Sequence, residues 1–489
     1  MSRASWGGVL VQAGLIALVV PAFGRCTEYT TMAGDDAGTP GPGGGPQPDG
    51  GAVGEVGIAA CEPAEAPPAD ALFVAPPVRL EDGEGNGTRE KPFATVALAL
   101  AAAEARGGAP IVLAAGVYAE SLVLAVAVPY SLQGAWIAEG GAWRRDCSAG
   151  YVDRTQLVSS AATGLTVQNA ARLGLRNLTV RTEASATQEP ASRYGLFAVQ
   201  TDVTLDNVRV SAPPAVRGAN GTPGTPGAPT TCSVAAGCVA TAVPGVAPAA
   251  ATPASDSGTF EIGGYTPRAG TPATLPGSAG SPGTPGGQGA SSSFCAAGAT
   301  CGSSSCEALV GDVTGGAGQC GCGGGGGGPG SAGQGGGASV AVYVVGHGVQ
   351  IVNSVLTSGA GGAGGTGGAG GAGSVGAPGA AGAPADCYQP MCCGCSPGDQ
   401  CYSGANWNAC CRTAAPTVVA VAGGTPGGAG ATGGAGQRGG AGAGGPSYAL
   451  VLFGNARKIQ TASQYVFGQG GAGPDGARAG AAGAELVVP

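Results

Sequence analysis

A glycine at every third position, unbroken from Gly361 to Gly382, constrains this chain more than any other feature. The stretch 361–384 reads GGAGGTGGAGGAGSVGAPGAAGAP. Such a period suits a helix with three residues per turn in which one edge leaves no room for a side chain. The same phase returns at residues 218–229, 277–289, 315–336 and 424–442, and briefly at 470–476.

Three arrangements satisfy this period. A collagen triple helix needs three chains and roughly 15–20% proline, whereas the stretch 361–384 contains only Pro378 and Pro384. A disordered chain fits the composition, because 100 of the 489 residues are glycine and 37 are proline. The third arrangement is a polyglycine-II-like bundle of helices within one chain. The GGA and GGT triplets resemble those of the snow-flea antifreeze protein and of some phage adhesins.

The segments between the glycine-rich stretches predict an all-β coil. Residues 95–105 predict a short helix, residues 111–113 and 122–124 predict strands, and residues 115–118 predict a turn. Later segments each combine an apolar strand, a polar or glycine-containing turn and a second apolar strand. These segments are residues 164–180, 195–210, 341–356 and 449–466. Such repeats bury their apolar face only by stacking on one another.

Asparagine recurs at one place in three of these segments, as Asn177, Asn207 and Asn353, and Thr461 takes that place in the fourth. Asparagine tolerates the left-handed backbone of a sharp bend, and stacked coils can share an amide ladder. Two interpretations stay open. The residues form a ladder along stacked turns, or they are three ordinary turn asparagines.

The start of this region carries an ordered set of short motifs. They are Asp82-Gly83 with Gly87-Thr88, then Pro92-Phe93-Ala94-Thr95-Val96, then the strand end from Ala115 to Glu120. Over about 60 residues, this order resembles secreted bacterial right-handed parallel β-helix proteins of the pectate-lyase-like class. The resemblance implies a right-handed single-stranded parallel β-helix, here interrupted by glycine-rich triplet-repeat insertions with disulfide-rich tips. The class contains polysaccharide lyases and hydrolases.

The patterns divide the chain into seven parts. They are a signal peptide (1–25), a flexible Gly/Pro linker (26–60), an N-terminal β-helix portion (61–213), a Gly/Pro/Cys-rich insertion (214–339), a β-helix rung (340–358), a Gly-triplet and Cys-rich insertion (359–446), and a C-terminal rung with a tail (447–489). Residues 361–384 lead out over 24 residues, roughly 75 Å at about 3.1 Å per residue, and 424–445 return over 22. The two insertions therefore predict two glycine fingers that project side by side.

The N-terminus predicts export. Arg3 precedes an apolar run from Val9 to Phe23, which is too short to span a bilayer comfortably. Two processing routes stay open: cleavage after Gly24, and lipidation of Cys26, although Arg25 departs from the small residue usual before a lipidated cysteine. The predicted location is extracytoplasmic, either secreted or attached to the outer membrane or cell surface, with membrane contact only through a lipid anchor.

The cysteines predict disulfides. There are 17, and setting Cys26 aside leaves an even number, which suits oxidised pairs in an exported protein. The candidates are Cys61, Cys147, Cys232, Cys238, Cys295, Cys301, Cys306, Cys320, Cys322, Cys387, Cys392, Cys393, Cys395, Cys401, Cys410 and Cys411. The cluster 295–322 contains five cysteines and the cluster 387–411 contains seven, both odd numbers. If Cys61 pairs with Cys147 and Cys232 with Cys238, at least one disulfide must therefore join the two clusters.

No set of residues indicates a reaction. Asp202 and Asp206 are weak candidates for acid–base chemistry. Arg176 and Arg209 lie at neighbouring positions of the repeat pattern, and the whole set is more typical of solvated charges on the surface of the coil. Residues 82–86, with Asp82, Glu84 and Asn86, have calcium-type oxygen ligands but fit a loop that opens the coil. His347 has no nucleophile pattern near it. We therefore assign no catalytic, cofactor-binding or metal-binding residue and expect no cofactor.

The charge composition argues against nucleic acid as a partner. A net charge of −8, with Lys91 and Lys458 as the only lysines, provides no basic footprint for nucleic acid. We predict an exported surface protein with a structural or adhesive role, no catalytic activity and an extracellular polysaccharide or other cell-surface ligand. The alternative is a carbohydrate-binding or polysaccharide-degrading enzyme of the pectate-lyase-like class. Ice binding is a more remote third option that rests on the antifreeze resemblance alone.

Overall fold

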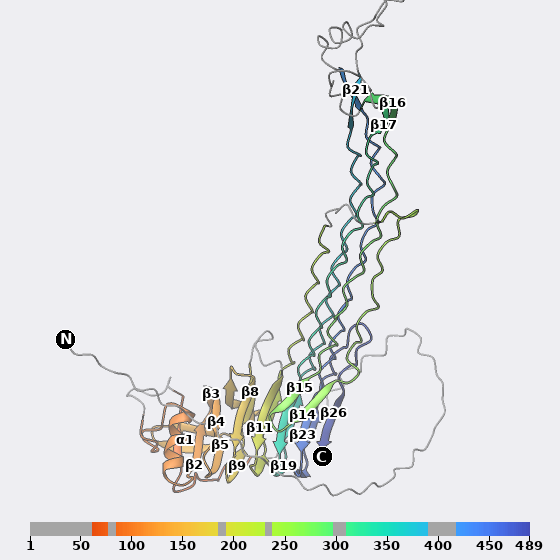
Figure 1. The fold of residues 1–489 in the computed structure, drawn as a ribbon. Coiled ribbons are helices and arrows are strands. Elements are labelled where there is room, and N and C mark those ends of the chain that lie inside the picture. The colour runs from red at the N-terminus through yellow and green to blue at the C-terminus, as the bar shows by residue number, and fades with distance from the viewer. Residues whose placement is uncertain (1–60, 77–84, 184–191, 230–236, 297–309, 390–416) are drawn as a thin grey trace, which may run out of the picture. The chain divides into compact units, whose positions relative to one another are not determined.

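The computed structural model describes residues 61–76, 85–183, 192–229, 237–296, 310–389 and 417–489 (Figure 1). The predicted signal peptide, the linker 26–60 and Cys26 lie outside these ranges. So do Cys232 and the cysteines at 301, 306 and 392–411, together with Asp82 and Glu84.

Three parallel sheets dominate the described residues, and we call them together the coil. The first contains the parallel strands β1 (Leu72–Val74), β2 (Pro110–Ala114), β5 (Pro129–Glu139), β9 (Arg172–Arg176), β12 (Val203–Asp206), β19 (Gly348–Val352) and β24 (Arg457–Thr461). An eighth strand, β6 (Ala142–Arg145), pairs antiparallel with β5. The second contains β3 (Gly116–Ala119), β7 (Thr155–Ser159), β10 (Thr179–Thr182), β13 (Arg209–Ala212), β20 (Val355–Ser358) and β25 (Gln464–Val466). The third contains β4 (Leu122–Leu124), β8 (Thr163–Gln168), β11 (Arg193–Val199), β18 (Ser339–Val345), β23 (Ser447–Phe453) and β26 (Ala482–Val488).

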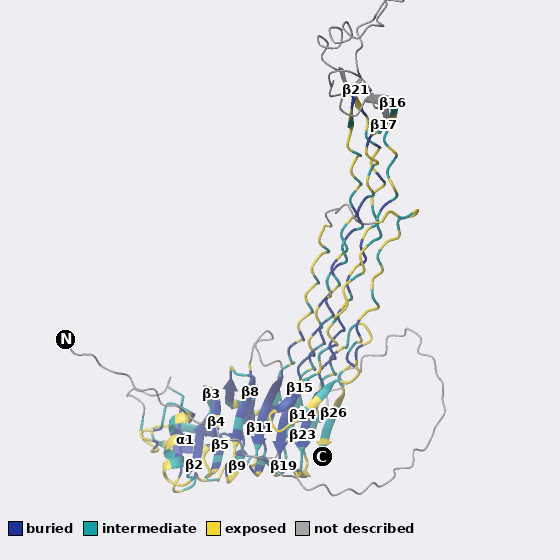
Figure 2. Cartoon of the chain, viewed as in Figure 1, coloured by how far each residue is buried: buried dark blue, intermediate teal, exposed yellow. Residues whose placement is uncertain are grey.

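From β8 onward the chain adds one strand to the third, first and second sheets in turn. Each of the four predicted repeat segments therefore contains three strands, one more than its pattern indicated. Aliphatic residues stand in register at the buried positions of neighbouring strands. Figure 2 shows the strands of the coil largely in the colour of buried residues. In the first sheet the stacked pairs are Leu173 and Leu175, Val203 and Leu205, and Val349 and Ile351. Full burial of such a side chain contributes about 1.5–3 kcal/mol.

Helix α1 (Val96–Ala105) covers the first turn of the coil with an apolar face of Val96, Ala99, Leu100 and Ala103. Thr95 caps it, since its hydroxyl accepts a hydrogen bond from the Leu98 amide at 3.3 Å. The predicted helix and the strands at 111–113 and 122–124 are confirmed.

The turn predicted at residues 115–118 is wrong, because residues 116–119 form β3. The motif residue Glu120, just after β3, accepts hydrogen bonds from the Val96 and Ala97 amides at 2.8 and 2.9 Å. The carboxylate thereby satisfies amides that a helix start leaves unpaired.

Six long extended stretches leave or rejoin the coil, and we call them runs 1 to 6. They are run 1 (213–229), run 2 (237–257), run 3 (268–290), run 4 (315–338), run 5 (359–384) and run 6 (422–446). A shorter stretch, 467–481, hydrogen-bonds to runs 5 and 6. Backbone hydrogen bonds join the runs at three-residue intervals. In runs 1 and 5, for example, the amides of Gly218, Gly221 and Gly224 donate to the carbonyls of Ala363, Thr366 and Ala369 at 2.8 Å each.

Glycine is required where two runs meet, because a side chain would displace the neighbouring backbone. A Cβ at Gly367 of run 5 would lie 1.8 Å from the Gly439 carbonyl oxygen of run 6, and real Cβ atoms essentially never approach within 3.0 Å. Run 4 lies among runs 1, 3, 5 and 6. There a Cβ at Gly326 would strike Gly277 and one at Gly327 would strike Gly371, which explains the unbroken GGGGGG at 323–328.

The register of the coil continues into the bundle of runs. Ser339 of β18 pairs with Ser447 of β23. In the runs that lead into these strands, the Gly336 amide donates to the Ala443 carbonyl at 2.8 Å, and Gly333 donates to Gly440 at 2.9 Å. The same offset persists as far as Gly321 and Gly428. The stacked strands thus set the alignment of the runs.

Two glycine fingers that project side by side were predicted, one from each insertion, and runs from both chain segments share one hydrogen-bonded bundle. The segment 214–339 also leaves and returns twice, because run 2 leads back to a hairpin of β14 (Gly258–Glu261) and β15 (Gly264–Pro267). The hairpin packs on the outer face of the third sheet. The Tyr265 amide donates to the Tyr194 hydroxyl at 2.7 Å, and the Tyr343 hydroxyl donates to the Glu261 carbonyl at 2.6 Å.

Four strands lie where runs 3 to 6 reach their far ends. They are β16 (Ser291–Ala296), β17 (Val310–Thr314), β21 (Ala385–Gln389) and β22 (Thr417–Val421), in the order β17-β16-β21-β22. Strands β16 and β21 come from different chain segments and pair through Ala296 and Tyr388. We call these strands the tip sheet. It joins the two segments by backbone pairing.

A substitution at a packed glycine tests the bundle. Gly367→Ala should destabilise it by about 1–3 kcal/mol, because the added methyl group must push two backbones apart. Ala369→Ser, two residues away at an exposed position, should change stability by less than about 0.5 kcal/mol. Differential scanning calorimetry of both variants checks this. Equal effects at the two positions would contradict the packing.

Candidate functional site

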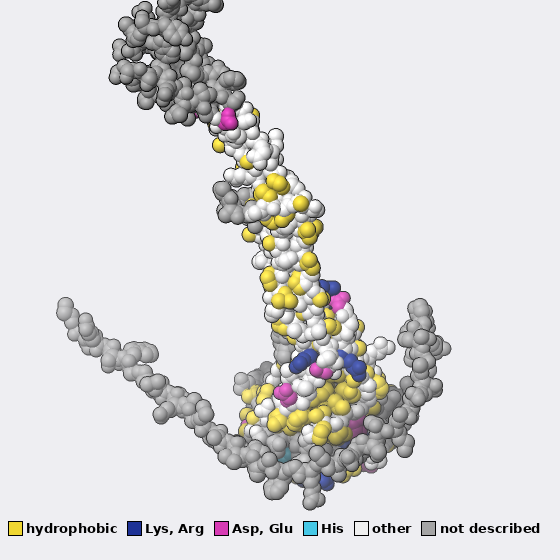
Figure 3. Space-filling model, turned by 45° about the vertical axis from the view of Figure 1, so that its right-hand side comes forward, with side chains coloured by type: hydrophobic (Ala, Val, Ile, Leu, Met, Phe, Trp, Pro, Cys, Tyr) yellow, Lys and Arg dark blue, Asp and Glu magenta, His cyan; other side chains and the backbone are white. Residues whose placement is uncertain are grey.

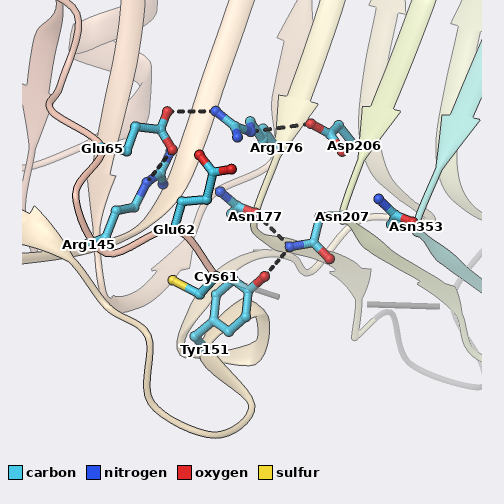
Figure 4. Close-up of a pocket in the computed structure, with 10 residues that line it drawn as sticks. All are labelled: Cys61, Glu62, Glu65, Arg145, Tyr151, Arg176, Asn177, Asp206, Asn207 and Asn353. Carbon is cyan, nitrogen blue, oxygen red and sulfur yellow. Dashed lines mark hydrogen bonds and ion pairs between the residues drawn. The ribbon is translucent and has the colours of Figure 1, made fainter. Parts of the chain in front are cut away.

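A polar cavity of about 170 Å³ lies on one side of the coil (Figure 4). It is lined by Cys61, Glu62, Glu65, Arg145, Tyr151, Arg176, Asn177, Asp206, Asn207 and Asn353. Residues 61–65, which we call the strap, form one wall, and three successive turns of the coil form the other. Arg145 of β6 and Tyr151 of the short helix Tyr151–Arg154 complete the lining. The cavity lies beside the point where the chain bends from the first sheet to the second.

Ion pairs hold the strap against the coil. Glu65 Oε2 lies 2.8 Å from Arg145 Nη2, and Glu65 Oε1 lies 2.6 Å from Arg176 Nη1. Arg176 Nε also lies 3.2 Å from Asp206 Oδ2, across the register of β9 and β12. Burial lowers the pKa of Arg145, and the Glu65 carboxylate opposes that effect. The Arg145 guanidinium also lies 4.1 Å from the centre of the Trp136 ring.

The asparagine ladder is present in part. Asn177, Asn207 and Asn353 have φ of 53°, 60° and 46°. Asn207 Nδ2 donates to Asn177 Oδ1 at 2.7 Å and also to the Tyr151 hydroxyl. In the fourth turn the prediction is wrong by one residue. Val352 pairs with Thr461, so Ala462, with φ 45°, takes the place of Asn353.

The other residues named as candidates do not converge. Asp202 Oδ1 accepts from the Gly348 amide at 3.0 Å and lies 3.6 Å from His347 Nδ1, at the opposite end of β12 from Asp206. Arg209 lies 3.5 Å from Asp153. Among the described residues no three His, Cys, Asp or Glu side chains form a group that could hold a metal.

Of the residues considered as calcium ligands, Asp82, Glu84 and Asn86, the structure describes only Asn86. Its Oδ1 accepts a hydrogen bond from the Thr88 amide of the same loop at 3.2 Å.

The disulfides match one of the two assumed pairs. Cys61 bonds to Cys147, with a Cα–Cα distance of 5.4 Å, and ties the strap to the coil. Cys238 bonds to Cys320, not to Cys232, so a second staple joins run 2 to run 4. Cys322 and Cys387 are also disulfide-bonded. Because Cys320 bonds to Cys238, four cysteines are left in the cluster 295–322, an even number. The seven cysteines of 387–411 and Cys232 also make an even number, so the count no longer requires a disulfide between the two clusters.

The strap residues Glu62 and Glu65, and their neighbours Arg145 and Tyr151, were missed by the sequence analysis. The strap lies far from the repeat segments in the chain, whereas Arg145 and Tyr151 lie shortly before the first of them. No spacing signals that the strap returns to the coil. Cys61 was the one usable signal, because its bond with Cys147 brings the strap to the loop before Tyr151.

No family model, curated protein or solved structure matches this chain. The disulfides, among them Cys61–Cys147 and Cys238–Cys320, suggest an extracytoplasmic environment. In the described ranges, no helix has the length and apolarity to cross a membrane.

The ladder predicts a graded effect at Asn207. Asn207→Gly should lower the unfolding free energy by about 1–3 kcal/mol, because Asn177 and Tyr151 lose a buried partner. Asn207→Ala should lower it by about 1–2 kcal/mol more, because alanine is strained at positive φ. Urea unfolding checks both variants.

Asn169→Ala is the control, at an exposed left-handed position (φ 53°). It should show the backbone effect alone. If the alanine and glycine variants of Asn207 were equally stable, the strain argument would be wrong.

The staple between runs 2 and 4 generates a separate expectation. It closes a loop with a sequence separation of 82 residues, so Cys238→Ser with Cys320→Ser should destabilise the bundle by about 2–4 kcal/mol. Hydrogen exchange followed by peptide mass spectrometry should then show faster exchange in runs 2 and 3. Cys61→Ser with Cys147→Ser should leave those runs unchanged and loosen residues 61–65 instead.

Proposed function

We propose that this protein is an extracytoplasmic structural or adhesive protein. Its coil is a parallel β-helix of the pectate-lyase-like class, its six runs are polyglycine-II-like helices, and its tip sheet presents the contact surface. The observation that carries this proposal is the backbone hydrogen bonding among the runs at three-residue intervals. Such bonding makes a long, slender shaft from residues that cannot build a conventional apolar core.

The surface of the bundle supports a spacer role. Runs 4 and 5 contain no charged residue, and runs 1, 2, 3 and 6 contain one each, Arg217, Asp256, Arg268 and Arg438. In Figure 3 most of the coloured charges on this face lie on or near the coil. Along the shaft, which is otherwise white and yellow, the picture shows one blue and magenta pair on the lower part and one magenta side chain near the far end. A surface with so few charges offers little for specific recognition, so we assign recognition to the tip sheet and the cysteine-rich segments it flanks.

The chemistry of the coil favours this role over catalysis. General acid–base catalysis needs a carboxyl group or imidazole that is free to exchange protons with substrate. In the cavity, Glu65 is held by two guanidinium groups and Asp206 by one. His347 and Asp202 face each other away from that cavity.

Attachment assays test the proposal. Beads coated with the full-length protein should attach to purified extracellular polysaccharides or to intact bacterial cells. Fab fragments raised against residues 390–416 should block attachment, whereas Fab fragments against residues 27–60 should not.

A matched assay addresses the enzyme alternative. The same polysaccharides, incubated with the protein, should release no new reducing ends and no unsaturated products. Turnover that is lost in Asp206→Asn or Glu62→Gln would overturn the proposal in favour of a polysaccharide-degrading enzyme. Attachment that neither Fab blocks would remove the tip from its recognition role.

A further inference from the structure

The last turn of the coil changes character at its inward positions. Along the first sheet these positions carry aliphatic pairs from β9 to β19. In register with Val349 and Ile351, however, β24 places Lys458 and Gln460. The strand-to-strand pairing therefore directs polar side chains to the places that form the core in every preceding repeat.

An inward carboxylate meets this lysine from the third sheet. Glu485 of β26 stands in register with Leu450, whose side chain is fully buried in the core. Lys458 and Glu485 form an ion pair across the end of the coil. The Lys458 ammonium also lies 5.5 Å from the centre of the Tyr465 ring on β25. One residue from each sheet thus contributes to a polar plug, defined here as Lys458, Glu485 and Tyr465.

Without this plug, the strands at this end of the coil could pair with the strands of another chain. Among the described residues, β24, β25 and β26 are the outermost strands of their sheets at this end, so each presents an unpaired backbone edge. Val487, in register with the core residue Leu452, is 59% exposed there. Parallel edges with an apolar interior between them are a template for another chain with the same strand spacing.

The opposite end of the coil restricts the geometry of any such pairing. Helix α1 covers the first turn with Val96, Ala99 and Leu100, so the last turn of one copy cannot stack on the first turn of another. Two copies could meet only through their last turns. The contact would then be two-fold and closed, and its product would be a dimer, not a filament.

We infer that the Lys458–Glu485 ion pair closes the end of the coil against a second copy of this chain. Stacking would take both charges out of water, and the loss of hydration opposes association. In the single copy the two side chains stay about one-quarter exposed, 24% for Lys458 and 27% for Glu485, so they keep part of that hydration. The pair acts as an element against self-association.

The test is Lys458→Leu with Glu485→Leu in the full-length protein. Replacing an ion pair by apolar side chains is often neutral or stabilising, so the coil should still fold. Analytical ultracentrifugation should show a dimer that forms at concentrations at least tenfold lower than for the unaltered protein. If the double leucine variant misfolds by circular dichroism, Lys458→Met with Glu485→Met serves in its place with the same expectation.

Two controls locate the contact. Adding Val487→Lys to the double leucine variant should restore the monomer, because it returns a charge to the end of the coil. Adding Val375→Lys, on run 5 and 77% exposed, should leave the dimer intact. A monomeric double variant, a filament, or a dimer insensitive to Val487→Lys would each overturn the inference.

Discussion

The structure depends on the absence of a Cβ atom in glycine. Where two runs meet, glycine replaces a side chain with direct contact between backbones, and each amide can then donate to a carbonyl of the neighbouring run. These hydrogen bonds replace the apolar core that the runs lack. Because glycine loses the most conformational freedom on folding, an isolated run gains too little from its own contacts. The bundle therefore needs partners on several sides and fixed ends.

The coil supplies those fixed ends. Strands β13, β18, β20 and β23 are aligned by burial of their aliphatic side chains, and the runs that start or finish at these strands inherit that alignment. The hairpin β14–β15 adds an aromatic contact at the base, where Phe260 of β14 stacks on Tyr343 with ring centres 5.8 Å apart. At the far end the tip sheet joins the two chain segments again. Runs 3 to 6 are thus each held at both ends, which limits the entropy that they can gain by loosening.

Local patterns predicted what local physics determines. The helix at 96–105, the stacked apolar repeats and the left-handed asparagines follow from residue types and their period. The third strand of each turn was missed because residues such as 179–182, with TVRT, have one strongly apolar position and no alternation to reveal them. Thr461 was misplaced by one residue because Ala462 accepts the left-handed bend without an amide to mark it. The strap cavity, the hairpin and the Cys238–Cys320 bond bring together residues far apart in the chain, and no local period encodes such meetings.

The most direct test of this account is amide hydrogen exchange on the unaltered full-length protein. In runs 4, 5 and 6 the glycine amides that donate between runs, such as Gly327, Gly368 and Gly436, should exchange orders of magnitude more slowly than an unstructured glycine chain. Their protection should approach that of the strands of the coil. Exchange at the unstructured rate throughout these runs, with the coil still protected, would contradict the claim that backbone pairing without side chains holds the bundle together.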